Sequence, residues 1–347
     1  MNYKKVKNIF LAAFFVLYIN AFAGSHFLSI LVPCYNCAKT LEKTVESIYA
    51  QNITVVPFEV VCTDDCSTDN TLEILRQLEK EHDNFRVICH TTNQGGGAAT
   101  NTCADNAQGD LFYRLDSDNL FGAPGTVDRM IKLLDETGCD IVMVQIQRNF
   151  NEKIIPGRED LVFKGTNSIY TLEDAIKDPA NPATSGNYLF TRDSFLKAGG
   201  YLEGHGADTF CFGFKQLATG SKIAILPDSY YLHYINNEGY WSRGERAGIN
   251  IPKMYQVFFD YQEVLDQKSR KILKQAQDGQ VYFWELIHKK KLKLLSRDIL
   301  QQLFDGYSLL IQNDYRSALT CLKSAYERGA YSARLKKLIE ELEKNLI

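Results

Sequence analysis

Five short apolar runs, the first of them with β-branched residues, alternate with segments of helical periodicity between residues 26 and 147. The runs are FLSILVP (27–33), PFEVVCTDD (57–65), NFRVICH (84–90), DLFYRLD (110–116) and CDIVMVQ (139–145). Strands that alternate with helices usually pair in parallel and are buried on both faces. The sequence therefore predicts an α/β domain with a mostly parallel central sheet flanked by helices.

Polar and turn-forming residues follow each of the first four predicted strands. In chain order they are Pro33, Tyr35 and Asn36; Asp64 and Asp65; Asn93 and Gly95 to Gly97; and Asp116, Ser117 and Asp118. Ligands of parallel sheets bind at the carboxyl ends of the strands. We therefore expect these residues to form one site at that edge of the sheet.

The rest of the chain has a different pattern. From about residue 151 to 246 the alternation is lost and Gly and Pro are frequent, which indicates loops and short strands that complete the site. After about residue 251 the pattern is helical. The chain has 347 residues, which is longer than one typical domain, and its 45% apolar content is enough for a sizeable core. We therefore predict a domain at 24–250 and an α-helical C-terminal region at 251–347.

The last helices place small and large residues as a tetratricopeptide unit does, at Gly306, Tyr315, Ala318, Leu322 and Ala325. One such unit is weak support, because stacked repeats normally number three or more. An ordinary helical cap is the favoured interpretation, and a protein partner for these helices is a further hypothesis.

The N-terminus has the features of a targeting segment. Lys4, Lys5 and Lys7 precede an apolar run over 9–19, and the small-x-small sequence Ala-Phe-Ala ends at Ala23. Eleven apolar residues fit the apolar core of a signal peptide better than a membrane span. We predict that residues 1–23 are a cleaved signal peptide or, as the alternative, that 8–23 anchor the chain in a membrane. Either implies the lumen of the secretory pathway, the cell envelope or a membrane surface.

The charge balance excludes one class of partner. The chain has 39 basic and 42 acidic residues in a mixed order, for a net charge of −3. Such a chain has no overall field that would attract a polyanion. We therefore expect no nucleic acid partner.

Nine cysteines are spread along the chain. A chain of this length does not need disulfides to fold, so most are expected to be buried thiols. The spacings Cys34-x-x-Cys37 and Cys62-x3-Cys66 leave a zinc or redox site as an alternative, and one disulfide is favoured over a metal site for an exported protein.

Three of these segments together resemble the family 2 inverting glycosyltransferases, which have the nucleotide-sugar-binding GT-A fold. SILVPCYN is similar to the family's first strand and Pro-x-Tyr-Asn turn, and FEVVCTDDCSTDNT to its EIIVVDDGSTDNT. NQGGGAATN and AQGDLFYRLDSDN are similar to its Asn-x-Gly helix start and Asp-x-Asp motif. The resemblance covers about residues 27–233.

The resemblance implies roles on the donor side. Asp118 would bind Mn²⁺ or Mg²⁺, and Asp116 would contact the ribose and the metal. Asp65 would accept a hydrogen bond from the uracil imide, with Asp64 beside it, and Tyr35 would lie against the base. Pro33 would fix the turn, while Asn36 and Ser117 complete the nucleotide-sugar site.

The family takes its general base from an acidic pair that follows a Gly-Gly-aromatic turn, which implies Asp208 here. Ala207 stands where the family usually has Glu, which puts acceptor specificity in doubt. Glu203 and His205 in the same loop are alternative bases.

Three further residues concern the metal and the diphosphate. His233 either approaches the metal or diphosphate or is a packed strand residue. Arg243, in a Gly-flanked stretch, would bind the leaving diphosphate. Thr100 stands where the family often has Arg, so a diphosphate contact is either missing or supplied by Arg114 or Arg243.

These roles predict a metal-dependent, inverting glycosyltransferase of the hexosyltransferase type. It would move a sugar from a nucleotide-diphospho donor, expected to be a UDP-sugar, to a hydroxyl of a glycan, lipid or protein. The alternative is a nucleotide-sugar-binding protein that has lost catalysis and docks a partner through its helical tail. A nucleotidyltransferase of similar fold is disfavoured, because VPCYNCAKT lacks a Gly-rich signature ending in Arg and Lys.

Overall fold

The computed structural model describes residues 26–150, 153–156, 169–177, 186–204, 206–234, 240–278 and 292–346. The predicted signal peptide or anchor at 1–23 and the alternative base His205 lie outside these residues. Within the described ranges, no helix combines the length and apolar character needed to cross a membrane.

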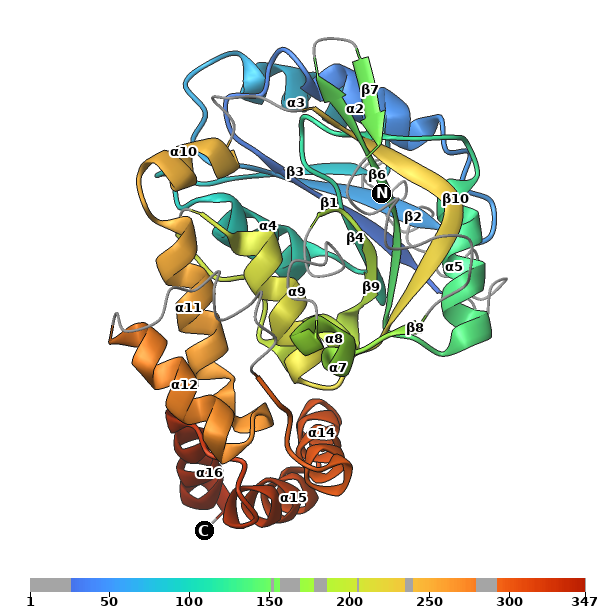
Figure 1. Ribbon diagram of the computed structural model, residues 1–347. Helices are drawn as coiled ribbons and strands as arrows, with labels where there is room; N and C mark the ends of the chain where they lie inside the picture. The colour runs from blue at the N-terminus through green and yellow to red at the C-terminus, as the bar shows by residue number, and fades with distance from the viewer. Residues whose placement is uncertain are drawn as a thin grey trace.

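One sheet of ten strands forms the centre of the described chain (Figure 1). Eight strands follow each other in the order β3-β2-β1-β4-β9-β6-β10-β5, with β7 beside β6 and β8 beside β10. The strands are β1 (Leu28–Cys34), β2 (Phe58–Asp64), β3 (Phe85–Cys89), β4 (Leu111–Arg114), β5 (Leu120–Phe121), β6 (Ile141–Phe150), β7 (Lys153–Pro156), β8 (Ile169–Tyr170), β9 (Leu189–Thr191) and β10 (Ile223–Tyr234).

The predicted parallel arrangement is confirmed for the main strands. β1 pairs in parallel with β2 and β4, β2 with β3, and β6 with β10. The short strand β9 lies between β4 and β6 and is antiparallel to both, so β4 and β6 still point the same way. The remaining pairings, β10 with β5 and β8 and β6 with β7, are antiparallel. The sheet is therefore mixed. Most of its strands point the same way, namely β1, β2, β3, β4, β6 and β10.

Helices cover both faces of the sheet, as the alternation predicts. Alternate residues of β1 divide between the two cores: Leu28, Ile30 and Val32 face one, and Leu31 faces the other. The first face is covered by α2 (Leu41–Tyr49), α3 (Thr71–Glu81) and α5 (Thr126–Thr137). The second is covered by α4 (Gly96–Asn106), α7 (Leu172–Lys177), α8 (Arg192–Ala198) and α9 (Asp208–Ala218).

The prediction of loops and short strands for residues 151–246 was wrong for α7, α8, α9 and α10 (Tyr240–Arg246). α8 has only seven residues, too few to show a helical period. All but one of the eleven residues of α9 are buried, so it has no polar face and no amphipathic pattern. Its sequence, DTFCFGFKQLA, gives little sign of a helix for the same reason.

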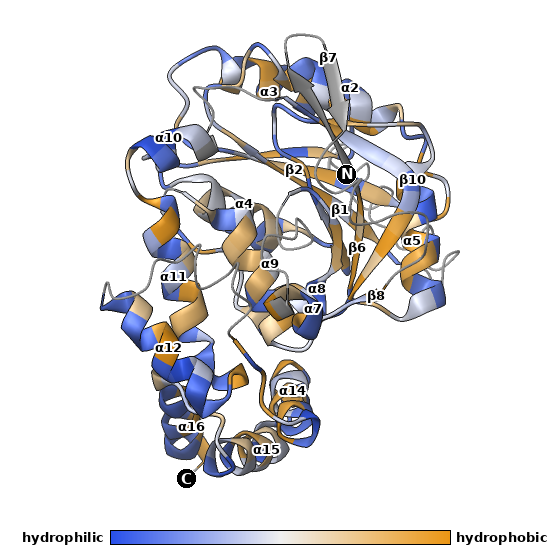
Figure 2. Ribbon diagram, viewed as in Figure 1, coloured by the Kyte–Doolittle hydropathy of each residue, from blue (hydrophilic) through white to orange (hydrophobic). Residues whose placement is uncertain are grey.

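The C-terminal part is helical, as predicted. Its elements are α11 (Asn250–Asp260), the 3₁₀ helix η2 (Gln262–Val264), α12 (Gln267–Gln277), α14 (Arg297–Ile311), α15 (Tyr315–Glu327) and α16 (Ala333–Leu346). In Figure 1, α14, α15 and α16 lie together at the end of the molecule opposite β7. Figure 2 shows hydrophobic residues concentrated in the central strands and hydrophilic ones on the outer sides of α12 and α16.

A buried ion pair joins these helices to the rest of the chain. Arg334 of α16 contacts Glu263 of η2, whose carboxylate also accepts a hydrogen bond of 2.8 Å from the hydroxyl of Tyr307 in α14. The Arg334 guanidinium lies 3.9 Å from the ring centroid of Tyr261, and the Tyr261 hydroxyl donates to the carbonyl of Ala198 in α8. One hydrophobic core therefore continues from the second face of the sheet into the C-terminal helices.

All nine cysteines are free thiols. The expectation of buried thiols is confirmed for Cys34, Cys37, Cys62, Cys103, Cys139 and Cys211. Among the described residues, no group of three or more His, Cys, Asp or Glu is arranged to hold a metal ion, so the zinc alternative has no support.

Candidate active site

The parallel register brings the predicted site residues to one edge of the sheet. Cys34 is opposite Asp64, Asp64 is opposite Cys89, and Leu31 is opposite Arg114. Since β4 ends three residues before the end of β1, the segment after Arg114 has room to turn across the edge. The strand ends that carry the predicted residues therefore lie side by side.

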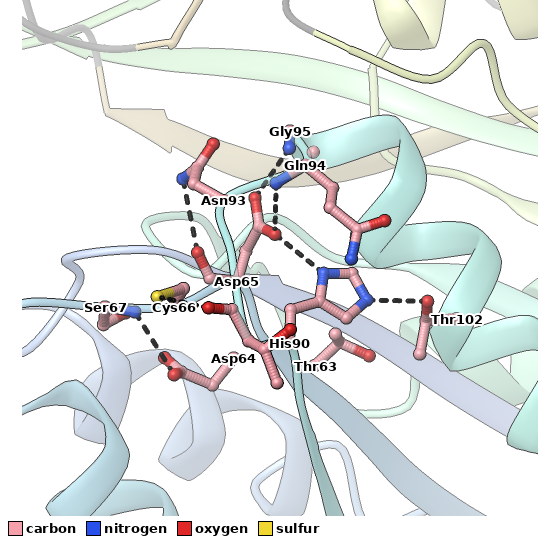
Figure 3. A network of polar contacts seen from close by, with 12 residues as sticks. Thr63, Asp64, Asp65, Cys66, Ser67, His90, Asn93, Gln94, Gly95 and Thr102 are labelled. Carbon is pink, nitrogen blue, oxygen red and sulfur yellow. Dashed lines mark hydrogen bonds and ion pairs between the residues drawn. The ribbon is translucent and has the colours of Figure 1, made fainter.

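Asp65 is fully engaged by protein donors (Figure 3). Its Oδ1 accepts hydrogen bonds from the backbone N–H of Gln94 (2.8 Å) and lies 2.7 Å from Nδ1 of His90, and its Oδ2 accepts from the N–H of Gly95 (2.7 Å). Nε2 of His90 in turn lies 2.8 Å from the hydroxyl of Thr102 in α4. A carboxylate at the start of a helix satisfies free N–H groups and favours the helix dipole. Asp65 therefore fixes the start of α4.

The neighbouring Asp64 has an oxygen without a protein partner. Its Oδ2 accepts from the N–H of Ser67 at 3.2 Å, whereas its buried Oδ1 makes no hydrogen bond. Leaving a buried acceptor unsatisfied costs about 1–3 kcal/mol, so a donor from a ligand is favoured there. Of the two carboxylates, the geometry favours Asp64 over the predicted Asp65 for a contact with the base.

The other residues around the nucleotide edge have distinct positions. Asn36 supports the loop after β2: its Oδ1 accepts from the N–H of Thr68 (2.8 Å) and its N–H donates to Oγ of Ser67 (3.0 Å). Tyr35 is exposed and available for stacking. Pro33 lies inside β1 and not in the turn, opposite Thr63. It is tolerated in this central strand because β4 ends opposite Leu31.

The Asp116–Asp118 loop is held by the protein on two sides. The backbone carbonyl of Ser117 accepts hydrogen bonds from the hydroxyls of Thr40 (2.9 Å) and Thr44 (3.0 Å) at the start of α2. Asn119 donates from its side chain to Oδ2 of Asp116 at 3.2 Å. The loop is therefore positioned before any ligand arrives.

Burial, with the nearby charge of Asp116, raises the pKa of Asp118 to about 7. A raised carboxyl pKa means that the anion lacks sufficient positive charge around it. The carboxylates of Asp116 and Asp118 are hard oxygen donors of the kind that Mn²⁺ and Mg²⁺ prefer, and a bound diphosphate would supply further oxygen ligands. Asp116 and Asp118 therefore fit a divalent cation, although they do not form a complete ligand set by themselves.

Asp208 reaches the same region from the other end of the site. It is the first residue of α9, and its buried Oδ2 lies 3.1 Å from Nη2 of Arg114. The same nitrogen lies 2.8 Å from Oδ1 of Asp116. The predicted base and the predicted metal-binding loop therefore share one guanidinium.

Close packing against α4 positions the loop that precedes Asp208. A Cβ on Gly95 would lie 2.6 Å from the carbonyl oxygen of Gly204, and one on Gly97 would overlap the carbonyl oxygen of Leu202. The side chain of Asn101 both donates to the carbonyl of Tyr201 (3.0 Å) and accepts from its N–H (2.8 Å). The Gly-rich stretch therefore serves close approach of the two backbones as well as helix initiation.

Three predicted contacts can now be placed. Nδ1 of His233 lies 3.1 Å from Oδ1 of Asn119. Because Asn119 also donates to Asp116, a single side chain links His233 to Asp116. Thr100 is buried, and its hydroxyl donates to the carbonyl of Gly96, so it makes no contact with a diphosphate. Arg243 is exposed on α10.

Several supporting residues were not predicted. Thr40 and Thr44 carry no motif, and their role depends on the packing of α2 beside β4. His90 follows β3 directly, so the strand-end rule alone would have found it.

Comparison with known proteins agrees with this geometry. The family model described as "Glycosyl transferase family 2" matches residues 29–199. These residues form a glycosyl transferase family 2 domain. The matched residues contain Asp64, Asp65, Asp116 and Asp118, whereas Asp208 lies beyond them.

The chain has relatives with assigned names. It is 28% identical over 193 residues to the poly(ribitol-phosphate) beta-glucosyltransferase of Bacillus spizizenii, an alignment that covers 49% of this chain and 30% of that protein. The chain spans about a third of the length of two curated relatives that it matches.

Solved structures share its GT-A fold. Residues 1–349 of TarS from S. aureus, in complex with UDP-GlcNAc, superpose with a TM-score of 0.57 at 20% identity, covering 90% of this chain and 83% of that one. The mannosyltransferase PcManGT from Pyrobaculum calidifontis, in complex with GDP-Man and Mn²⁺, gives a TM-score of 0.53 at 19% identity, covering 91% and 79%.

Proposed function

We propose that this chain transfers a sugar from a UDP-sugar to an acceptor hydroxyl with inversion, in a reaction that depends on a divalent cation. The observation that carries the proposal is that several carboxylates with different environments lie at one edge of the sheet. Asp64 offers a free oxygen, Asp118 has a raised pKa, and Asp208 is tied to Asp116 through Arg114.

The donor lies along the carboxyl ends of β1, β2 and β4 in this proposal. Oδ1 of Asp64 accepts the imide N–H of uracil, and the exposed ring of Tyr35 lies against the base. Asp116 and Asp118 hold Mn²⁺ or Mg²⁺, which neutralises charge on the diphosphate leaving group. Arg243 on α10 approaches the same diphosphate.

Asp208 is the general base. It takes the proton of the acceptor hydroxyl as that oxygen forms a bond to the anomeric carbon. The bond between the anomeric carbon and the diphosphate oxygen breaks on the opposite face, so the configuration inverts and UDP leaves with the electron pair. Because Oδ2 of Asp208 contacts Arg114, its Oδ1 is the oxygen that takes the proton.

The ligands named for the solved neighbours support a nucleotide-sugar donor, and one of the two is a UDP-sugar. TarS was solved with UDP-GlcNAc, and PcManGT with GDP-Man and Mn²⁺. The acceptor is proposed as a glycan, lipid or protein hydroxyl. Export or anchoring by residues 1–23 is proposed from the sequence pattern only.

Thermal shift with a panel of nucleotide sugars tests donor binding, since a ligand that binds only the folded state raises the melting temperature. We expect a UDP-sugar to raise it with Mn²⁺ and to have little effect with EDTA. Asp118→Ala should abolish the shift. No shift with any donor would contradict the proposal.

Asp208→Asn separates catalysis from binding. It should keep the donor-induced shift and lower kcat by about 10²–10⁴, the range for loss of a general base. Ala207, in place of the family's Glu, leaves a catalytically impaired sugar-nucleotide-binding protein as the second candidate. Donor binding by the wild type without transfer or hydrolysis would favour that candidate.

A further inference from the structure

Arg114 occupies a central position between the two functional halves of the site. It is the last residue of β4 and only 4% exposed. One nitrogen of its guanidinium, Nη2, contacts both Oδ1 of Asp116 and Oδ2 of Asp208. These contacts are charge-assisted and largely removed from water, so they are among the stronger polar contacts that a protein makes. The loop of Asp116 and the helix of Asp208 are otherwise supported by different elements.

The guanidinium is also fixed from a third direction. Its central carbon lies 5.2 Å from the ring centroid of Tyr201. Tyr201 is held in place by Asn101 of α4, through hydrogen bonds to both its N–H and its carbonyl. Arg114 is therefore locked in orientation and cannot follow a displaced carboxylate without cost.

We propose that Arg114 is a positioning residue that couples the two carboxylates, and that it competes with a divalent cation for Asp116. This inference rests on the proposed function. With Asp116 engaged by a cation, Arg114 keeps Asp208 as its partner and holds the base carboxylate in one orientation. Without a cation, Arg114 supplies the positive charge at Asp116.

This competition predicts an effect that a purely structural residue would not have. Replacing Arg114 by an apolar residue removes a positive charge within hydrogen-bonding distance of a cation ligand. Arg114→Met should therefore bind Mn²⁺ more tightly, by about tenfold, since charges a few ångströms apart at a partly buried site interact strongly. The measurement is the EPR signal of free Mn²⁺ during titration of the protein without nucleotide.

The same variant should lose catalysis while keeping the donor. We expect kcat to fall by about 10²-fold, the effect of a misplaced catalytic group, with KM for the donor changed by less than about threefold. Arg114→Lys keeps the charge but lacks the planar fork. It should bind Mn²⁺ within about twofold of wild type, because the competing charge is retained, and recover part of kcat.

Arg192→Met is the matched control. Arg192 is likewise an engaged arginine: it donates to the carbonyls of Gly109 (2.8 Å) and Ala107 (2.7 Å) and lies 4.7 Å from the ring centroid of Phe112. It contacts none of the site carboxylates, so its loss should lower the melting temperature and leave the Mn²⁺ affinity unchanged.

The outcomes distinguish this inference from the proposed function. A folded Arg114→Met protein whose Mn²⁺ affinity is unchanged or weaker would overturn the competition. Wild-type kcat in Arg114→Lys would overturn the positioning role, and this test stands if Arg114→Met does not fold. A wild type that binds neither Mn²⁺ nor any nucleotide sugar would instead overturn the proposed function.

Discussion

Replacing Asp118 by Asn should stabilise the metal-free protein at neutral and alkaline pH. Burial and Asp116 raise the pKa of Asp118 to about 7, from an ordinary value of 3.8. A carboxyl whose pKa is higher in the folded than in the unfolded state destabilises the fold once it is ionised. The penalty is absent below about pH 4, grows as the pH rises, and is complete above about pH 7.

The size of the effect follows from the difference between the two pKa values. About three pH units at about 1.4 kcal/mol each give an upper limit of about 4 kcal/mol. Asp118 is partly exposed, and solvent screening reduces this to about 2 kcal/mol. With the unfolding entropy typical of a chain of this size, that corresponds to a rise in Tm of roughly 3 °C.

The assay is urea or thermal unfolding in EDTA at pH 4.5 and pH 8, with Asp83→Asn as an exposed carboxylate control. We expect Asp118→Asn to exceed the wild type at pH 8, the advantage to shrink at pH 4.5, and the control to stay within about 0.5 kcal/mol at both. Excess Mn²⁺ should reverse the order at pH 8, because only the wild type gains binding free energy. Equal stability of Asp118→Asn and wild type at pH 8 in EDTA would refute the reasoning.

Four other substitutions test the site. Cys66→Gly should raise the free energy of unfolding by about 0.5–1 kcal/mol in urea titrations, because Cys66 has a φ of 63° that glycine adopts without steric cost; a loss would contradict this. Asp64→Asn should weaken UDP binding about tenfold by calorimetry without lowering Tm, whereas Asp65→Asn should mainly lower Tm; the reverse pattern would return the base contact to Asp65. Gly97→Ala should cost about 2–3 kcal/mol, since the new methyl overlaps the backbone carbonyl of Leu202, and near-wild-type stability would show that the loop can move away.

Much of the fold was predictable because local and global signals agree over residues 26–147. The buried parallel strands are short apolar runs, and α2, α3 and α5 have an amphipathic period, so one pattern indicates both layers. The strand-end rule then placed Asp64, Asp65, Asp116 and Asp118 at one edge without knowledge of their contacts. The family match over residues 29–199 covers nearly all of this regular pattern and continues beyond its end.

The parts that were not predictable depend on contacts between distant residues. Strand β9 has three residues and no periodicity, and only its place between β4 and β6 makes it a strand. The division of labour between Asp64 and Asp65 is decided by His90 and by the start of α4, which occupy the oxygens of Asp65 alone. In the sequence the two residues are equivalent neighbours.

Backbone strain shows where the fold imposes conformations on this chain. Asn36, Cys66 and Ala207 all have positive φ (49°, 63° and 50°), and all three lie in loops that form the site. The family motif has Gly where this chain has Cys66. The surrounding fold therefore imposes the left-handed backbone conformation after Asp65, and Cys66 adopts it with steric strain that Gly would not have. Strained residues persist where the surrounding structure over-determines them. At Ala207 the left-handed turn directs the next residue, Asp208, into the first turn of α9 and onto Arg114. The turn that presents the proposed base is therefore intact although Ala207 stands where the family usually has Glu.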